Sequence, residues 1–164
     1  MKSPTHRNAY DTASRFLANR EYSSQQIRTK LKQRGFTQGE ITEALEKLIK
    51  HDYLNDSRFT RSLIEFYAFR RLRGPMEIRM RLQKAGIDRE LASDTIAEIY
   101  TPQVEKDLCL QDARKKAVAL REEDRQKRYA KLVGYLSRHG FSSDAIRYAV
   151  DKVLNNQSEV DDND

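Results

Sequence analysis

The sequence has one cysteine, three prolines, six glycines and no tryptophan among its 164 residues. A lone cysteine excludes an internal disulfide framework and a zinc cluster built on cysteines. So few glycines and prolines disfavour a turn-rich β fold. The longest uninterrupted apolar runs have four residues, whereas a membrane-spanning helix needs about 20. The N-terminus lacks the apolar core of a signal peptide. We therefore expect a helical protein of the reducing cytoplasm with no membrane partner.

Charge is what the sequence has in abundance. Charged residues make up 34% and hydrophobic residues 38% of the chain, against about 25% and 45–50% in a typical soluble domain. The 31 Lys and Arg exceed the 25 Asp and Glu, which gives a formal net charge of +6. This excess favours an acidic partner, either nucleic-acid phosphate or an acidic protein surface.

Three segments of the chain align on a glycine. Each glycine has a leucine four positions before it and a phenylalanine or isoleucine directly after it. A glycine commonly ends a helix, because the left-handed conformation required there disfavours a Cβ, and the next residue packs back on the helix. Three matches in one register predict a repeated helix–stop–helix unit. The predicted stops are Gly35, Gly86 and Gly140, which are 51 and 54 residues apart.

The residues around each stop predict further helices. Thr37 and Glu40 form a capping box, and Asp88 and Ser142 are good N-caps. Pro102 suits the first turn of a further helix. The sequence thus predicts an all-α protein, an elongated array of three tandem three-helix repeats with about nine helices in all. A compact ball of the same helices is the alternative, but the modest apolar content favours the array, which needs less interior.

The predicted divisions of the chain are an N-terminal arm, three repeats and an acidic tail. The tail has four carboxylates and one apolar residue, Val160, so we expect it to be disordered. The corresponding ranges are 1–8, 9–54, 55–101, 102–156 and 157–164.

Signals for catalysis are weak. His6, His51 and His139 are far apart in the sequence, and the last two lie in the predicted final turns of helices, where a positive charge is favourable. Cys109 lies on a predicted helix with no nearby histidine, so we expect a buried small hydrophobe. No phosphate-binding loop, dinucleotide fingerprint or zinc-protease motif is present. We predict neither an enzyme nor a cofactor or metal site.

Basic residues cluster in two stretches. Residues 70–84 hold six cations against Glu77 alone, and residues 114–131 hold eight cations against three acids. Arginine predominates in the first stretch, which suits bidentate contacts with phosphate or carboxylate. A solvated helix surface is the alternative for both. The candidate binding residues, including one from a weaker third set, are Arg28, Arg70, Arg71, Arg73, Arg79, Arg81, Lys84, Arg125, Lys127, Arg128 and Lys131.

Four segments resemble the RecX family of bacterial regulators of the RecA recombinase. They read SSQQIRTKLKQRGF, DYLNDSRF, GPMEIRMRLQKAGI and YLSRHGFSSDAI, at residues 23–36, 52–59, 74–87 and 135–146. The resemblance implies tandem three-helix repeats and a regulator without enzymatic activity. Leu72 stands where the family often has the first glycine of a K-G-x-G-P run, so we expect a stiffer hinge before Pro75.

The resemblance also implies the partners. Family members bind RecA and RecA–DNA filaments in the filament groove, and they inhibit the ATPase, strand-exchange and coprotease activities during DNA repair and recombination. We therefore expect a monomer that contacts the RecA filament and the phosphates of single- or double-stranded DNA. The alternative is a helical DNA-binding protein without a recombinase partner.

Overall fold

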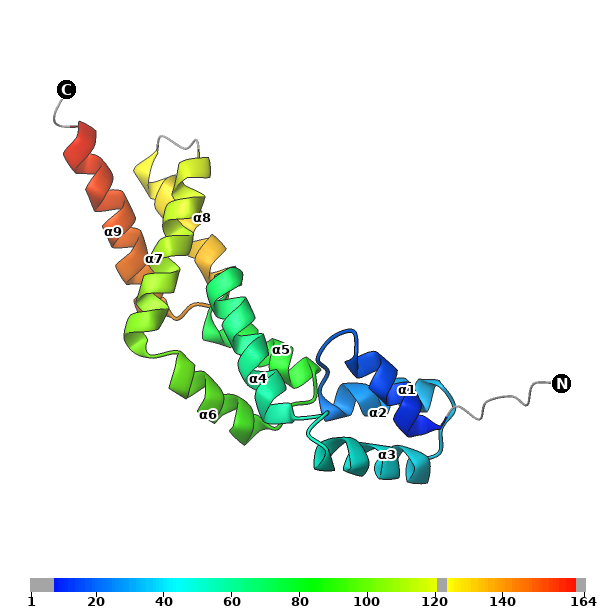
Figure 1. Ribbon diagram of the computed structural model, residues 1–164. Helices are drawn as coiled ribbons and strands as arrows, with labels where there is room; N and C mark the ends of the chain where they lie inside the picture. The colour runs from blue at the N-terminus through cyan, green and yellow to red at the C-terminus, as the bar shows by residue number, and fades with distance from the viewer. Residues whose placement is uncertain (1–7, 121–123, 162–164) are drawn as a thin grey trace.

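The computed structural model describes residues 8–120 and 124–161. These residues form nine α-helices and one π-helical turn, with no strand among them (Figure 1), which confirms the all-α class. The elements are α1 (Ala9–Leu17), α2 (Ser24–Gln33), α3 (Gln38–Lys50), α4 (Asp56–Glu65), η1 (Phe66–Arg70), α5 (Pro75–Lys84), α6 (Arg89–Ile99), α7 (Pro102–Ala119), α8 (Arg125–Arg138) and α9 (Ser143–Asp161).

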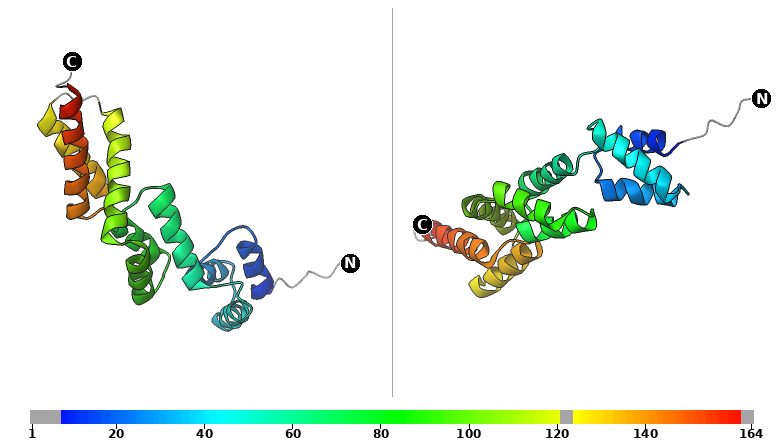
Figure 2. Two further views of the ribbon diagram at one scale, coloured as in Figure 1. Left: turned by 60° about the vertical axis from the view of Figure 1, so that its left-hand side comes forward. Right: turned by 90° about the horizontal axis from the view of Figure 1, so that it is seen from below.

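The helices form three groups, here called unit 1 (α1–α3), unit 2 (α4–α6 with η1) and unit 3 (α7–α9). The units follow one another along an elongated body, with unit 1 at one end and the tips of α7, α8 and α9 at the other (Figures 1 and 2). The predicted repeat array is therefore confirmed, and the compact ball is excluded.

Local sequence fixes where the helices begin. Thr37 and Glu40 form the predicted capping box of α3, and Asp88 accepts hydrogen bonds from two backbone N–H groups at the start of α6. Pro102 is the first residue of α7. At α2, Ser23 makes a further capping box with Gln26. Each cap satisfies N–H groups that the first helical turn leaves without partners.

The three glycines end helices as predicted. Their φ angles are +85° at Gly35, +73° at Gly86 and +83° at Gly140. The residue after each glycine donates its N–H to the carbonyl of the leucine five positions earlier, over 3.3, 3.0 and 3.4 Å. The packing that accompanies this hydrogen bond is also present, since the residue after the glycine is buried in units 2 and 3 and half-buried in unit 1.

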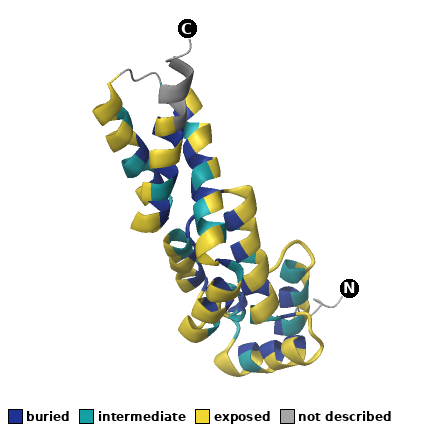
Figure 3. Ribbon diagram, turned by 90° about the vertical axis from the view of Figure 1, so that its left-hand side faces the viewer, coloured by how far each residue is buried: buried dark blue, intermediate teal, exposed yellow. Residues whose placement is uncertain are grey.

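Buried hydrophobic residues form two separate clusters, and Figure 3 shows buried positions on the helices of the array in dark blue. The smaller one belongs to unit 1 and includes Leu54. The larger one runs from Phe59 to Leu154 through units 2 and 3. Units 2 and 3 therefore share one core, whereas unit 1 has its own.

Each helix stop in units 2 and 3 contacts the second helix of the preceding unit. The hydroxyl of Ser23, the N-cap of α2, donates to the carbonyl of Ala85 over 2.5 Å. The N–H of Gly74, the N-cap of α5, donates to the carbonyl of His139 over 2.8 Å. Ala85 and His139 directly precede the stop glycines, so the same contact is used twice. In unit 1 the equivalent stop at Gly35 faces open space.

The chain between α4 and α5 departs from regular helix geometry. Phe66–Arg70 form a π-helical turn, and Leu72 has a φ of +51° although its side chain is buried. A left-handed conformation is unfavourable for leucine by about 1–2 kcal/mol. Burial in the shared core offsets this cost and anchors the turn before Gly74 and Pro75, where α5 begins as predicted.

The described helices and their caps reach into both predicted terminal segments. Helix α9 continues to Asp161 and so overlaps residues 157–161 of the predicted tail, whose disorder stays a prediction. A formed helix gains one hydrogen bond for each added residue, and no glycine or proline interrupts it there. Asn8, assigned to the N-terminal arm, caps α1. His6, the rest of the arm and residues 162–164 lie outside the described residues. No described helix is long and apolar enough to cross a bilayer.

Candidate functional site

The candidate binding residues lie along the whole molecule and not in one cluster. Arg28 lies on α2, residues 70–84 on η1, α5 and the turn between them, and residues 125–131 at the far end of α8 (Figure 1). An extended partner could therefore contact all three units.

Arg73 and Arg81 are not the uncompensated cations that the sequence suggested. Arg73 Nε lies 3.1 Å from one carboxylate oxygen of Glu77, and Arg81 Nη2 lies 2.5 Å from the other. Arg81 also donates to the hydroxyl of Tyr67 over 3.1 Å and lies over its ring. Spacings of four residues bring both arginines to Glu77. These two residues therefore hold α5 against η1, and Glu77 offsets part of the positive charge that made them binding candidates.

A buried polar cluster joins units 2 and 3. His139 Nδ1 lies 2.5 Å from Asp112 Oδ2 and 2.7 Å from Arg73 Nη1. Asp112 is 4% exposed and also accepts from the hydroxyl of Tyr135 over 3.1 Å. The Tyr100 hydroxyl donates to the Arg73 carbonyl. Burial raises the pKa of both tyrosines, so both hydroxyls remain donors.

His139 lies at the end of α8, as predicted, but the sequence did not reveal its contacts. Arg73, Asp112 and His139 come from three different segments of the chain. Arg73 and Asp112 are 66 and 27 residues away from His139, and no local pattern relates them. The cluster positions the junction between units 2 and 3, so Arg73 belongs to this junction.

The remaining arginines of the middle stretch stand beside exposed apolar side chains. Arg70, Arg71 and Arg79 are exposed, and none has a carboxylate partner among the described residues. Phe66, Phe69, Met76 and Met80 are 45%, 51%, 62% and 52% exposed. We call these residues the middle surface: Phe66, Phe69, Arg70, Arg71, Met76, Arg79 and Met80.

The middle surface has two parts. Met76, Arg79 and Met80 share one face of α5, because residues three and four apart are neighbours on a helix. The Arg71 guanidinium lies 5.5 Å from the centre of the Phe66 ring. The apolar members could not be predicted from the sequence, since a run such as Phe66–Phe69 resembles core and the π-helical turn that leaves both phenylalanines exposed has no recognised sequence signal.

The basic residues of α8 have mixed roles. Arg125 donates to the side chain of Asn155 on α9 over 3.2 Å, and Arg128 donates to the carbonyl of Ala117 on α7 over 3.3 Å. Both therefore contribute to packing within unit 3. Lys127 and Lys131 are exposed, and Arg28 on α2 is half-buried.

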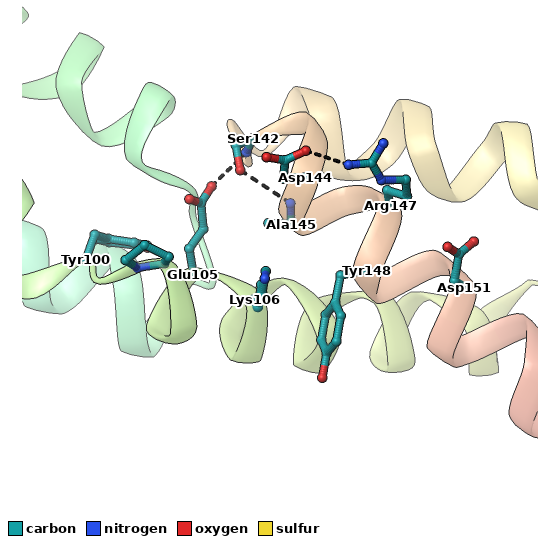
Figure 4. A pocket seen from close by; sticks show the side chains of 10 residues that line it. Tyr100, Glu105, Lys106, Ser142, Asp144, Ala145, Arg147, Tyr148 and Asp151 are labelled. Carbon is teal, nitrogen blue, oxygen red and sulfur yellow. Dashed lines mark hydrogen bonds and ion pairs between the residues drawn. The ribbon is translucent and has the colours of Figure 1, made fainter.

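A polar groove lies between α7 and α9 (Figure 4). Its volume is about 590 Å³. Glu105 of α7 accepts from the backbone N–H of Ser142 over 2.7 Å and so caps the start of α9 from another helix. Asp144 and Arg147 form an ion pair of 2.7 Å within α9. Glu105 thus helps to hold α9 to α7, whereas the Asp144–Arg147 pair stabilises α9 itself.

Cys109 is buried in the shared core, as predicted. Burial, with a smaller contribution from Asp112, raises the pKa of its thiol to about 12. The thiolate, which is the nucleophilic form, is therefore scarce at neutral pH.

Comparison with known proteins agrees with this architecture. Sequence profiles of the first and third three-helix domains of RecX match residues 9–48 and 104–150. The regulatory protein RecX of Prosthecochloris aestuarii is 33% identical over 156 residues, which cover 95% of this chain and 100% of that protein. The chain belongs to the RecX family. A second relative, the regulatory protein RecX of Vibrio vulnificus, is 31% identical to this chain. That match covers 85% of this chain and 89% of the Vibrio vulnificus protein.

The three-dimensional likeness to RecX extends over most of the array. The crystal structure of RecX from Lactobacillus salivarius has a TM-score of 0.79 and 25% sequence identity to this chain. The match covers 90% of this chain and 94% of the RecX structure. Unit 2, with the middle surface, lies within a shared RecX architecture.

Proposed function

We propose that this protein binds RecA and RecA–DNA filaments in the cytoplasm and inhibits their ATPase, strand-exchange and coprotease activities without being an enzyme. Membership of the RecX family supports a regulatory role. The elongated array supports an extended partner, since its basic residues are distributed over three units.

The observation that carries the proposal is the composition of the middle surface. Phosphate binding requires cations but no exposed Phe or Met side chains. Exposed aromatic, methionine and arginine side chains together are typical of the contact regions of protein partners. The three arginines without carboxylate partners favour an acidic surface on that protein. We therefore assign the middle surface to the recombinase and the remaining candidate residues of α2 and α8, which are Arg28, Lys127 and Lys131, to DNA.

The mechanism is steric and electrostatic. A rigid body built from units 2 and 3 contacts a RecA protomer through the middle surface, while the basic residues of α2 and α8 reach DNA phosphates or the next protomer. A monomer bound in this way would oppose subunit addition or the nucleotide-linked transition of the filament.

The DNA-dependent ATPase rate of RecA tests this function. Full-length protein should lower the rate, and the triple variant R70E/R71E/R79E should need at least about tenfold more protein for half-inhibition, which corresponds to about 1.4 kcal/mol. R89E/R114E/R138E changes the same number of exposed arginines elsewhere and should remain close to wild type. Equal loss in both triple variants would point to net charge and not to this surface.

The alternative, a DNA-binding protein without a recombinase partner, is separated by the apolar residues. F69A/M80A removes no charge, so it should weaken inhibition of RecA and leave the salt dependence of DNA binding unchanged. In a pulldown from nuclease-treated extract, RecA should still be recovered with the wild-type protein. Recovery that depends on intact DNA would favour the alternative.

A further inference from the structure

A second charged groove lies between units 1 and 2, outside the middle surface. Its volume is about 290 Å³. The loop between α1 and α2 contributes Arg20, and the last turn of α5 contributes Arg81 and Lys84. The two sides meet where Ser23 bonds to Ala85, and the same approach of the loop to the end of α5 is visible in Figure 1. Neither unit alone could form this groove.

The groove has a surplus of positive charge. Arg20 and Lys84 are exposed, and neither has a carboxylate partner among the described residues. Arg81 shares Glu77 with Arg73, so this group of three carries one net positive charge. Glu21 lines the groove and shares Arg58 with Asp52, over 3.3 Å and 2.9 Å, so this second group carries one net negative charge. Arg20, Lys84 and the Arg81 group outweigh it, and the groove keeps a positive surplus.

Aromatic rings position the two guanidinium groups before any ligand binds. Arg20 lies 4.3 Å from the centre of the Tyr22 ring, and Arg81 lies 4.1 Å from the centre of the Tyr67 ring. Arg81 is further held by its hydrogen bond to the Tyr67 hydroxyl. Groups positioned in this way lose less conformational freedom on binding. Phe59 and Leu63 add an apolar lining, which strengthens ionic contacts by excluding water.

We infer that this groove is a phosphate-binding site that joins units 1 and 2. A phosphate group offers several acceptor oxygens, which can satisfy two guanidinium groups and an ammonium together, whereas one carboxylate has only two oxygens. The inference rests on the proposed function for its favoured source of phosphate, the backbone of DNA in the filament. A free nucleoside triphosphate has the same chemistry and is distinguished below.

Occupation of the groove would also fix the orientation of unit 1. Units 1 and 2 have separate hydrophobic clusters and meet through polar contacts such as that of Ser24 N–H with Asp56, at 2.7 Å. A ligand held by Arg20 on one side and Lys84 on the other would restrict movement between them. The site thus couples phosphate binding to the shape of the array.

The test compares R20Q/K84Q with the control K50Q/R89Q, which removes the same two charges from exposed positions outside the groove. The probe is a fluorescently labelled oligothymidylate, titrated at several salt concentrations. R20Q/K84Q should make the negative slope of log K against log salt less steep by about 1.4, since each lost contact with a single strand contributes about 0.7. The control should change the slope by less than half of this. Equal changes in both variants would overturn the site.

Two further arms identify the ligand. If ATP at millimolar concentration displaces the oligothymidylate from the wild-type protein but not from R20Q/K84Q, free nucleotide is the source of phosphate. If ATP displaces the oligothymidylate from neither protein, the site binds the polynucleotide. The RecA ATPase assay separates this inference from the proposed function. Normal oligothymidylate binding by R20Q/K84Q with lost inhibition would overturn the phosphate assignment in favour of an acidic protein segment. If R20Q/K84Q lost oligothymidylate binding but the wild-type protein did not inhibit RecA, the phosphate site would be supported and the proposed function would be refuted.

Discussion

The two junctions of the array, between units 1 and 2 and between units 2 and 3, are built around equivalent contacts. They differ in the packing that surrounds those contacts. In both, a helix stop contacts an N-cap of the preceding unit. At the first junction a serine hydroxyl donates to the stop, and the two hydrophobic clusters remain separate. At the second junction two backbone N–H groups, those of Gly74 and Met76, donate to the stop, and one core passes through both units.

The difference shows how a repeat protein can combine a rigid part with an adjustable one. Backbone contacts, the contact of Arg73 with His139 and a shared core leave the second junction little freedom. The first junction depends on side chains and on a groove lined by charges. Solenoid stability is the sum of unit and junction contributions, so the first junction should open at a lower free-energy cost than the second.

The largest expected effect comes from crowding the second junction. Gly140→Ala places a Cβ against the backbone of Glu77 and keeps a left-handed φ. The conformation costs about 1–2 kcal/mol and the overlap about 1–3 kcal/mol, so we expect a total near 3 kcal/mol or more in urea unfolding. Gly35→Ala is the matched control, because an added Cβ there meets nothing within 4 Å, and it should show the conformational cost alone. If Gly140→Ala lost no more unfolding free energy than Gly35→Ala, units 2 and 3 would be able to move apart at this contact without cost.

Removing the buried carboxylate should have the next largest effect. Asp112→Ala leaves His139 and Tyr135 without their common partner, and hydrogen bonds to a buried charge contribute about 1.5–3 kcal/mol. We expect a loss of about 2–3 kcal/mol, together with faster reaction of the buried Cys109 with a thiol reagent. Asp107→Ala, an exposed position on the same helix, should change neither. Unchanged labelling of Cys109 in Asp112→Ala would show that the cluster does not hold the core closed.

The sequence predicted the parts of this fold that local chemistry determines. The stops at the three glycines follow from backbone conformation, and the capping boxes follow from spacings of three residues. Contacts between units could not be predicted in this way, because Arg73, Asp112 and His139 become neighbours only when the units stack. For the same reason, the surplus of charge in residues 70–84 did not show that Glu77 neutralises part of it.

The candidate site was predictable only in outline. Arginine content drew attention to the middle stretch, and Arg70, Arg71 and Arg79 are indeed exposed there. The apolar half of the middle surface depends on a π-helical turn, and the groove between units depends on Arg20, whose single charge stands out in no sequence window. Tertiary placement, and not composition, selects these residues.

Leu72 lies in the turn that leads into the second junction. Its left-handed backbone conformation destabilises the fold, whereas the burial of its side chain stabilises it. Leu72→Ala loses packing and keeps the left-handed φ, whereas Leu72→Gly loses slightly more packing and relieves the φ. We therefore expect Leu72→Gly to be more stable than Leu72→Ala by about 1 kcal/mol. In the regular helix at Leu82 the order should be reversed, with glycine less stable than alanine by about 0.5–1 kcal/mol. Thermal melts of the four variants measure both differences, and the same order at both positions would contradict a left-handed Leu72.

The smallest effect on stability is expected at the first junction. Ser23→Ala removes both the cap of α2 and the hydrogen bond to Ala85, and loss of a cap costs about 1 kcal/mol. Thr37→Ala removes a comparable cap inside unit 1 and serves as the control.

In hydrogen exchange, Ser23→Ala should reduce protection both around α2 and at residues 84–88 of unit 2, whereas Thr37→Ala should affect α3 alone. Labelling of Cys109 should stay at the wild-type rate in both variants, because the shared core of units 2 and 3 does not depend on this junction. If residues 84–88 kept their full protection in Ser23→Ala, the Ser23 hydroxyl would be a helix cap only, and the coupling of unit 1 to unit 2 would lie in other contacts, such as those of Ser24 with Asp56 and of Arg58 with Glu21.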